Sequence, residues 1–408
     1  MTTWLTPERE PFYGGTYFPA RDGDRGTRTG FLTLLQRLEQ AYRERPEEIA
    51  SRADEIVAAI RRSLRPPASE GGGEVTLSAV DLAVSQLSTA FDPQYGGTQR
   101  APKFPSTMPN RLLLRQHART RDARPLEMAE RTLTRMAEGG IYDQIGGGFH
   151  RYSGDARWLV PHFEKMLYDN ALLTLAYVEA WQVTEDPLYR RVARQVLDYI
   201  AREMTSDEGG FYSATDADSL TPHGEREEGW FFTWTPGELA AALTEDEKRL
   251  ISAYYGVSDQ GNFEGRTILN VVRPLDEIAA EFEWEMPRTQ AVLAAAAKKL
   301  YRARAGRPAP LLDDKILTSW NGLMISAFAR AGFVFDDDAY LDHASSAADL
   351  ILERVRKEGR LLRSYREGVA RHNAYLEDYA FLIAGLLDLF QATGEPRWFR
   401  EAVALDPG

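Results

Sequence analysis

The sequence predicts a mainly α-helical protein in which an inner ring of helices is wrapped by an outer ring, an α/α toroid. After a short N-terminal region, segments with helical hydrophobic spacing follow one another with few strands between them. The segments 162–183, 316–333 and 374–391 are apolar on nearly every side, which is typical of buried helices. The segments 188–202 and 340–356 each carry one charged face. This alternation indicates two concentric layers.

Loops of recurring composition support the same fold. Clusters of aromatic residues and Gly occupy residues 91–97, 139–149 and 209–213, and a weaker cluster occupies 360–365. They recur at intervals of roughly 50 to 70 residues. A repeat of this kind is typical of stacked helical hairpins.

The elements expected before residue 66 differ from the helical hairpins, because they include two strands. Residues 2–18 contain two β-rich pieces around a Pro-Glu-Arg-Glu-Pro turn and predict a β-hairpin, which helices at 30–45 and 47–64 follow. A lone hairpin is only marginally stable in water, so we expect this one to belong to a sheet. Residues 66–75 are rich in Pro and Gly and predict a linker.

Beyond the linker, the sequence predicts a series of helices and one short β-rich excursion. The excursion covers residues 209–234, where Gly residues bound aromatic stretches. The helices are expected at residues 77–90, 108–120, 125–138, 162–183, 186–204, 236–242, 245–255, 288–304, 316–333, 337–356, 374–393 and 395–404.

The composition excludes several classes of function. A net charge of -12 without a basic stripe argues against a nucleic-acid partner. The absence of Cys removes disulfides, thiolate nucleophiles and Cys-ligated metals. The longest apolar run, 379–387, is too short to cross a membrane, and no signal-peptide pattern is visible at the N-terminus. We therefore expect a cytoplasmic protein. Because HExxH and GxGxxG motifs are missing, neither a metal nor a cofactor is predicted.

The first candidate site lies where the Gly-rich loop at 139–161 meets the apolar helix expected at 162–183. On a helix His162 and Asp169 would share one face, and a carboxylate in such an apolar setting needs a hydrogen bond or a raised pKa. The alternative is structural, with Glu164 facing the helix dipole and Asp169 held by a neighbouring helix. The candidate residues are Asp143, His150, Arg151, His162, Glu164 and Asp169.

Two further acidic clusters are candidates. In an extended chain Asp216 and Asp218 point the same way, so they could divide acid and base roles, although a polar turn explains them equally. The other cluster lies at the starts of the last two apolar helices, where aromatic side chains could stack on a sugar or could simply belong to the core. Its members are Trp320, Tyr375, Glu377 and Asp378.

Several long motifs resemble a known family. FDPQYGGTQRAPKFP, GGIYDQIGGGFHRYSGDARWLVPHFEKMLYDNALL, DADS, EEGWFFTW and SWNGLMI resemble the thioredoxin-domain-containing family typified by spermatogenesis-associated protein 20, over nearly the whole chain. The resemblance implies a thioredoxin-like domain fused to an (α/α)6 toroid similar to N-acylglucosamine 2-epimerases. Residues 1–65 would be a partial thioredoxin-like domain, 66–75 the linker and 76–408 the toroid, which we expect to lack its last helices. The Cys motif of the family is absent, so thiol-redox activity is not expected.

The resemblance also implies a carbohydrate-active protein, either a sugar epimerase or isomerase or a glycosidase, with a sugar or other small polar ligand. Epimerisation would use His150 and His162 as opposed acid and base. Hydrolysis would use two carboxylates about 5–10 Å apart, drawn from Asp169, Asp216, Asp218 and Glu377. The residues expected to bind the ligand are Asp143, Arg151, Glu164, Trp320, Tyr375, Glu377 and Asp378. The alternative is a non-catalytic binding or regulatory toroid.

Overall fold

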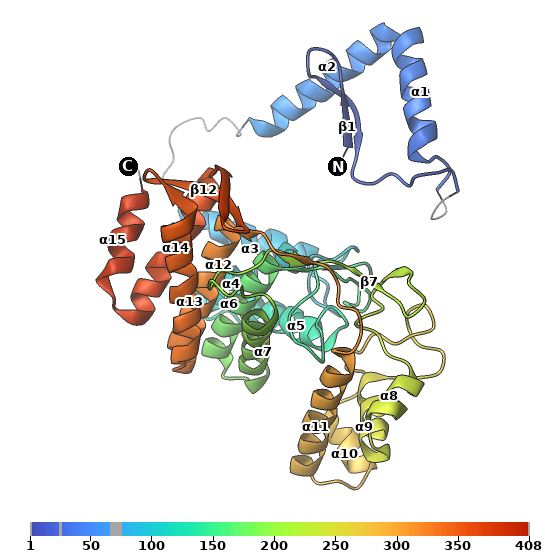
Figure 1. Ribbon diagram of the computed structural model, residues 1–408, viewed down its shortest axis with the longest axis vertical. Coiled ribbons are helices and arrows are strands. Elements are labelled where there is room, and N and C mark those ends of the chain that lie inside the picture. The colour runs from blue at the N-terminus through green and yellow to red at the C-terminus, as the bar shows by residue number, and fades with distance from the viewer. Residues whose placement is uncertain (1, 24–26, 66–75, 407–408) are drawn as a thin grey trace. The chain divides into compact units, whose positions relative to one another are not determined.

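The computed structural model describes residues 2–23, 27–65 and 76–406 (Figure 1). The chain divides into two compact units, Met1–Leu77 and Ser78–Gly408. The predicted linker at 66–75 lies outside the described residues.

The smaller unit contains the predicted β-hairpin and both predicted helices. Strands β1 (Thr2–Leu5) and β2 (Pro11–Gly15) pair antiparallel, with Thr2 opposite Gly15 and an irregularity after Trp4. Helices α1 (Phe31–Glu44) and α2 (Pro46–Leu64) follow. A small core of Phe12, Ile49 and Ala53 joins β2 to α2. Among the described residues this hairpin has no further strand beside it.

The larger unit is built around four helical hairpins. Each hairpin has an inner helix followed, after a short turn, by an outer one. The pairs are α4 (Asn110–Thr120) with α5 (Ala123–Glu138), α6 (Leu167–Thr184) with α7 (Pro187–Glu203), α12 (Thr318–Phe335) with α13 (Asp338–Leu350), and α14 (Leu376–Thr393) with α15 (Pro396–Leu405). Helix α3 (Ser78–Ala90) precedes them and packs on α5.

The inner helices lie side by side in the order α4, α6, α12 and α14 (Figure 1). Helices α6 and α12 are apolar over most of their surface, and most of their residues are buried. Helices α12 and α14 approach most closely where Gly322 faces Gly385, since a Cβ on either residue would overlap the backbone of the other helix. The outer helices α5 and α7 begin at capping Asp residues, Asp122 and Asp186, and the carboxylate of Asp186 accepts from the backbone N–H of Leu188 at 2.9 Å. The predicted fold class, a mainly helical toroid of α/α hairpins, is confirmed.

Three helices expected within the alternating series, and one that was not expected, lie outside the hairpin array. Helices α8 (Pro236–Ala242), α9 (Glu245–Tyr255), α10 (Leu275–Glu281) and α11 (Met286–Arg304) form a group inserted between α7 and α12 (Figure 1). They pack on cores of their own, one containing Trp234 and the other Ile278. Hydrophobic periodicity marks which face is buried but not which core buries it. Helix α10 was not predicted.

Short strands lie before the inner helices. The pairs are β3 (Tyr152–Ser153) with β4 (Pro161–His162), β5 (Lys165–Met166) with β6 (Ala214–Thr215), β6 with β9 (Leu312–Asp313), β7 (Asp218–Leu220) with β8 (Arg226–Glu228), and β10 (Ile316–Leu317), β11 (Arg356–Lys357) and β13 (Val369–Asn373) with β12 (Arg360–Arg366). The helix expected from residue 162 therefore begins only at Leu167, because ladder hydrogen bonds occupy the backbone before it. The helix expected at 337–356 ends at Leu350 and continues as a π turn to Val355.

No helix in the described ranges combines the length and hydrophobicity needed to span a bilayer.

Candidate active site

The candidate site lies at the N-terminal ends of the inner helices, where the long connections and short strands converge. The first turns of these helices hold Asn110 of α4, Tyr168 and Asp169 of α6, Trp320 of α12 and Asp378 of α14. Tyr168 and Trp320 meet edge to face with their ring centroids 4.8 Å apart, which joins α6 to α12.

Asp169 has a buried carboxylate that lacks a full set of partners. The residue is 4% exposed, and its Oδ2 atom has no hydrogen-bond partner among the described residues. Burial raises its pKa to about 7, and the charge of Arg151 and the hydroxyl of Tyr168 offset only part of that effect. A carboxyl group with a pKa near neutrality can both accept and release a proton, as acid/base catalysis requires.

Asp169 lines a cavity of about 230 Å³ between α4, α6 and the turn at 105–107. Asn110, on the opposite wall, also has a buried oxygen, Oδ1, without a partner in the described part of the chain. Leu172 and Leu173 supply apolar lining. A mostly apolar cavity with a few converging polar groups is the usual form of a small-molecule site.

A chain of charged residues leads from Asp169 to the β7–β8 hairpin. Arg151 Nη1 donates to Glu164 Oε2 at 2.8 Å, and His162 Nε2 lies 3.2 Å from the same oxygen. His162 Nδ1 lies 2.6 Å from Glu228 Oε1. Hydrogen bonds to Glu164 and Glu228 raise the pKa of His162 to about 9, and the hydrogen bond from His162, with help from Arg151, lowers that of Glu164 to about 2. At neutral pH His162 is therefore an imidazolium that donates protons and cannot act as a base.

Aromatic rings cover one side of this chain. Tyr152 stacks on the imidazole of His162 with centroids 5.2 Å apart, and Phe104 packs on Tyr152 at 4.8 Å. Phe104 directly precedes Pro105 and Ser106 of the Asp169 cavity. His162, Glu164, Arg151 and Asp169 thus lie in one region of the structure, and His162 reaches it from β4 and not from a helix.

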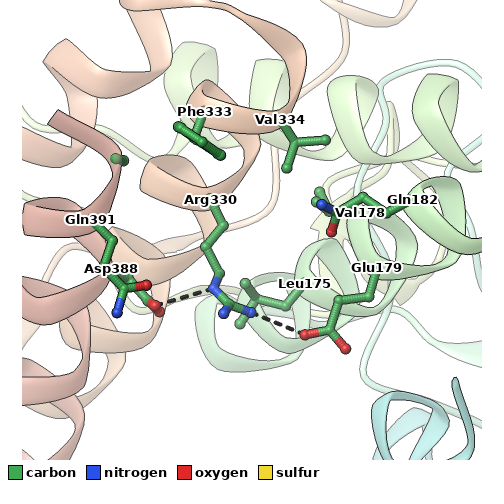
Figure 2. A pocket seen from close by; sticks show the side chains of 10 residues that line it. Leu175, Val178, Glu179, Gln182, Arg330, Phe333, Val334, Asp388 and Gln391 are labelled. Carbon is green, nitrogen blue, oxygen red and sulfur yellow. Dashed lines mark hydrogen bonds and ion pairs between the residues drawn. The ribbon is translucent and has the colours of Figure 1, made fainter. Parts of the chain in front are cut away.

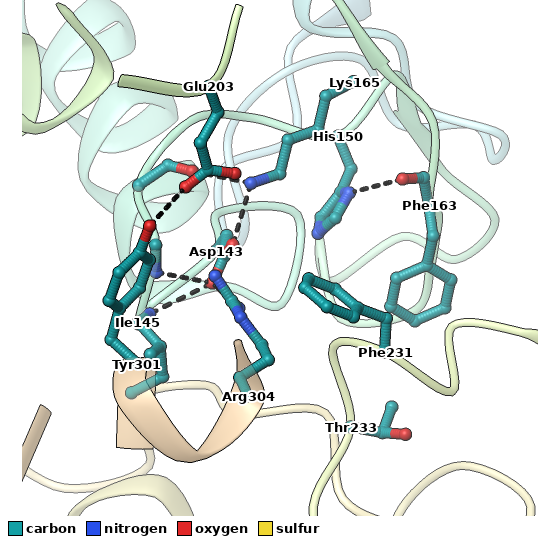
Figure 3. A network of polar contacts seen from close by, with 12 residues as sticks. Asp143, Ile145, His150, Phe163, Lys165, Glu203, Phe231, Thr233, Tyr301 and Arg304 are labelled. Carbon is teal, nitrogen blue, oxygen red and sulfur yellow. Dashed lines mark hydrogen bonds and ion pairs between the residues drawn. The ribbon is translucent and has the colours of Figure 1, made fainter. Parts of the chain in front are cut away.

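His150 lies in a different environment. It is 1% exposed, and its Nδ1–H donates to the carbonyl oxygen of Phe163 at 2.9 Å (Figure 3). Its ring packs against Phe163 and Phe232. Burial, with help from the charge of Lys165, lowers its pKa to about 3, so the imidazole is neutral. This histidine has no surface for a ligand, and the expected pairing of His150 with His162 as opposed acid and base is not formed.

Asp143 is also built into the interior. Lys165 Nζ and Arg304 Nη1 each donate to it at 2.8 Å, and the N–H groups of Ile145 and Gly146 donate at 3.1 and 2.9 Å (Figure 3). Burial opposes its ionisation, but the two cations together hold its pKa well below the usual range. A Cβ on Gly146 would overlap the guanidinium of Arg304, so the loop closes tightly around this arginine. Asp143 therefore anchors the loop, contrary to the ligand-binding role predicted for it.

In the second predicted cluster, the residue that contacts the candidate site is Glu228 and neither of the two predicted aspartates. Asp216 Oδ1 accepts from the N–H of Ala217 at 2.8 Å, and its Oδ2 lies 3.6 Å from Arg226. Asp218 stands opposite Glu228 in the β7–β8 register. Glu228, and not either aspartate, is the carboxylate of this hairpin that pairs with His162. The catalytic roles suggested for Asp216 and Asp218 stay predictions.

The third cluster mainly joins helices. Asp378 is fully buried and accepts from the N–H of Ser319 at 3.0 Å and from that of Tyr375 at 2.8 Å, which ties α14 to α12. Arg363 bridges Asp378 at 3.1 Å and the exposed Glu377 at 2.8 Å. Asp378 is thus a structural residue. Trp320, Tyr375 and Glu377 remain partly or largely exposed at the same end of the helices, so their predicted ligand-binding roles stay open to test.

The sequence interpretation missed a second group of charges, formed by Arg111, Glu179, Arg330 and Asp388. Arg330 Nη1 donates to Glu179 Oε1 at 3.0 Å, and its Nε donates to Asp388 Oδ1 at 3.1 Å. Single charges inside the otherwise apolar stretches of α6, α12 and α14 were the available signal. In the described part of the chain, no three His, Asp and Glu side chains converge in a way that could hold a metal ion.

Comparison with known proteins agrees with this description. Residues 1–61 match the domain family described as "Thioredox_DsbH: Protein of unknown function, DUF255". Spermatogenesis-associated protein 20 of Homo sapiens is 37% identical over 442 aligned positions, covering 99% of this chain and 56% of the human protein. The protein of the same name from Mus musculus is also 37% identical, covering 99% of this chain and 55% of its own length.

Solved structures show a distant likeness. A sugar epimerase from a ruminal bacterium is 13% identical with a TM-score of 0.35, covering 81% of this chain and 85% of its own. A family 76 α-mannanase of Bacteroides thetaiotaomicron is 12% identical with a TM-score of 0.47, covering 82% and 70%. Likenesses at this level concern the fold alone and say nothing about activity. The chain is therefore similar to spermatogenesis-associated protein 20 along nearly its whole length, as its motifs predicted, and it spans about 56% of the length of the human protein.

Proposed function

We propose that the chain binds a sugar at the N-terminal ends of the inner helices and transfers a proton on it through Asp169. The observation that carries the proposal is the carboxylate of Asp169, which is buried, lacks a partner for Oδ2 among the described residues, and lines a cavity. The carboxylates of Asp143, Glu164 and Asp378 are all held by cations or backbone N–H groups. Asp169 is the carboxylate that the site leaves available for chemistry.

The surroundings suit a polyhydroxylated ligand. Asn110 and Arg151 offer polar groups beside Asp169, and the rings of Tyr168 and Trp320 stand at the same helix ends. Sugars are bound in proteins by such combinations, since hydroxyl groups need polar partners and ring C–H faces rest on aromatic rings.

Of the two reactions expected, sugar isomerisation or epimerisation suits the charges better than hydrolysis. Proton transfer at carbon needs a group that accepts a proton, and a half-ionised Asp169 meets that need at neutral pH. The proton next to the sugar carbonyl would pass to Asp169, and its electron pair would form the double bond of an enediolate. The cationic Arg151, held by Glu164, would stabilise the negative oxygen before the proton returns to carbon. Hydrolysis requires a second available carboxylate, whereas Glu164 is bound to both Arg151 and His162.

Exchange of carbon-bound hydrogen with solvent tests the reaction directly. The chain is incubated in D₂O with a panel of monosaccharides, among them glucose, mannose and N-acetylmannosamine, and deuterium at carbon is followed by NMR. We expect incorporation that Asp169→Asn reduces by about 10²–10⁴-fold, the usual worth of an acid/base group. Asp342→Asn, on the exposed face of α13, is the matched control and should retain it. Release of reducing sugar from oligosaccharides without exchange would instead indicate hydrolysis.

A non-catalytic binding role is the second candidate, favoured by the pairing of most other acids in the region. It predicts that sugars raise the melting temperature of the wild-type chain and of Asp169→Asn alike, with no deuterium exchange in either. If no sugar shifts the melting temperature and none exchanges, both candidates fail.

A further inference from the structure

A second cavity lies deeper along the inner helices. It measures about 370 Å³ and is lined by the second halves of α6, α12 and α14 (Figure 2). Apolar walls come from Val178, Phe333 and Val334, and Phe333 is 67% exposed at its edge. The neighbouring Asp169 cavity is lined by the first half of α6. The rise of an α-helix separates the two sets of α6 residues by about 9 Å.

Charged groups from four helices meet beside this second cavity. Arg330 lies between Glu179 and Asp388, and Figure 2 shows both interactions across the cavity. Glu179 Oε1 also accepts from Arg111 at 2.8 Å and from Arg115 at 2.9 Å. Glu179 is the most buried of these side chains, at 13% exposure, whereas Arg111 and Arg330 are 31% and 33% exposed. The two guanidinium groups therefore remain accessible to a polar ligand at the edge of the cavity.

The cavity offers both donors and acceptors. Gln182 and Gln391 line it, and within the described residues their carboxamides form no hydrogen bond with the protein. Asp388 uses one oxygen for Arg330. A mixture of carboxamide, guanidinium and carboxylate groups beside an exposed aromatic ring matches hydroxyl groups, which both donate and accept.

One residue connects the two cavities. Arg111 lines the Asp169 cavity and donates to Glu179, which lines the second one. Leu172 and Glu179 stand two turns apart on the same face of α6, and Leu172 is 37% exposed. The strip of α6 between them contains Ala176, which lines the first cavity, and Leu175, which lines the second, and both residues are buried.

We propose that the substrate extends along this strip, so that one sugar unit occupies the Asp169 cavity and a linked unit occupies the cavity of Arg330, Gln182 and Gln391. The inference rests on the proposed function and deepens it: the substrate is an oligosaccharide and not a free monosaccharide. The second cavity acts in recognition and takes no part in proton transfer.

Affinity as a function of chain length tests this inference. Glucose and mannose are compared with their di- and trisaccharides by calorimetric titration. We expect the disaccharide of the accepted sugar to bind at least tenfold more tightly than the monosaccharide. The double variant Gln182→Leu, Gln391→Leu should lose that gain and keep monosaccharide affinity, because both positions are exposed and the change leaves the helices intact. Gln290→Leu, at an exposed site on α11, is the matched control and should keep the gain.

Equal affinities for the mono- and disaccharide, or a gain that survives in the double variant, would overturn the inference. Monosaccharide binding with deuterium exchange but no length preference overturns it alone and leaves the proposed function standing. Failure of every sugar to bind overturns both. Melting curves of each variant confirm that the fold is retained before affinities are compared.

Discussion

Asp143 and Asp169 lie in the same region of the sequence and are equally buried, at 6% and 4% exposure, yet their carboxyl groups differ in chemistry. Two cations and two backbone N–H groups hold Asp143 as an anion, with its pKa well below the usual range. Asp169 has no comparable partner, and burial raises its pKa to about 7. Burial alone therefore does not decide the charge of an aspartate. The pairing of its oxygens does, and it separates a structural carboxylate from a reactive one.

The largest expected loss of stability comes from replacing Asp143, the carboxylate that is paired. Asp143→Asn would leave Lys165 and Arg304 buried without their counter-charge. Removing one partner of a buried ion pair costs about 3–5 kcal/mol. Urea denaturation should show a loss of that size, with Asp342→Asn as a surface control near zero. A loss below about 1 kcal/mol would show that the network is not essential to the fold.

The same substitution at Asp169 should have the opposite sign. The folded chain holds the proton of Asp169 more tightly than the unfolded chain, so this group makes stability fall as the pH rises from about 4 to about 7. Asp169→Asn imitates the protonated form. It should match the wild type near pH 4 and exceed its stability by about 2–4 kcal/mol above pH 7, as measured by denaturation at several pH values. If the difference in stability between Asp169→Asn and the wild type did not change with pH, the claim that Asp169 is unpaired would be wrong.

His162 should show an intermediate effect. Its pKa is raised, so its pairing with Glu164 and Glu228 contributes fully below the ordinary histidine pKa and is lost as the pH rises through about 9. We expect His162→Gln to cost about 1–2 kcal/mol at pH 6, discounted for partial exposure, and progressively less above pH 9. Stability curves at these pH values check this, and a cost that grows with pH would exclude a stabilising imidazolium.

The smallest effect is expected at the rim. Glu377 pairs with Arg363 through a side chain that is 51% exposed. Exposed ion pairs contribute little, so Glu377→Gln should change stability by less than about 1 kcal/mol. Salt titration of the melting temperature provides the comparison, since the wild type and the variant should converge at high ionic strength. A larger loss would mean that Glu377 supports the buried Asp378 network.

The helices of three hairpins could be predicted because each pairs an apolar helix, α6, α12 or α14, with a more polar one. The start of α6 could not, because Lys165–Met166, directly before it, pairs with Ala214–Thr215, a strand far away in the sequence. The four inserted helices, α8 to α11, have the same local periodicity as the ring helices and differ only in the core they join. Local pattern therefore identified helices but not their membership of the array.

The sequence singled out the residues of this region but did not indicate the role of each one. The loop and helix that contain Asp143, His150, His162 and Asp169 were identified from the Gly-rich run and the isolated carboxylate. The roles depend on partners far away in sequence: Arg304 lies 161 residues from Asp143, and Glu228 lies 66 residues from His162. Without those contacts, a buried, paired aspartate and a buried, unpaired one have the same appearance in the sequence.

The central claim is that Asp169 titrates near neutrality in the folded protein. It is tested most directly by ¹³C NMR titration of aspartate carboxyl carbons, with the Asp169 signal assigned by its loss in Asp169→Asn. We predict a midpoint near pH 7 for that signal and an Asp143 signal that does not titrate above its ordinary range. A midpoint for Asp169 at or below about 4, the ordinary aspartate value, would contradict the account.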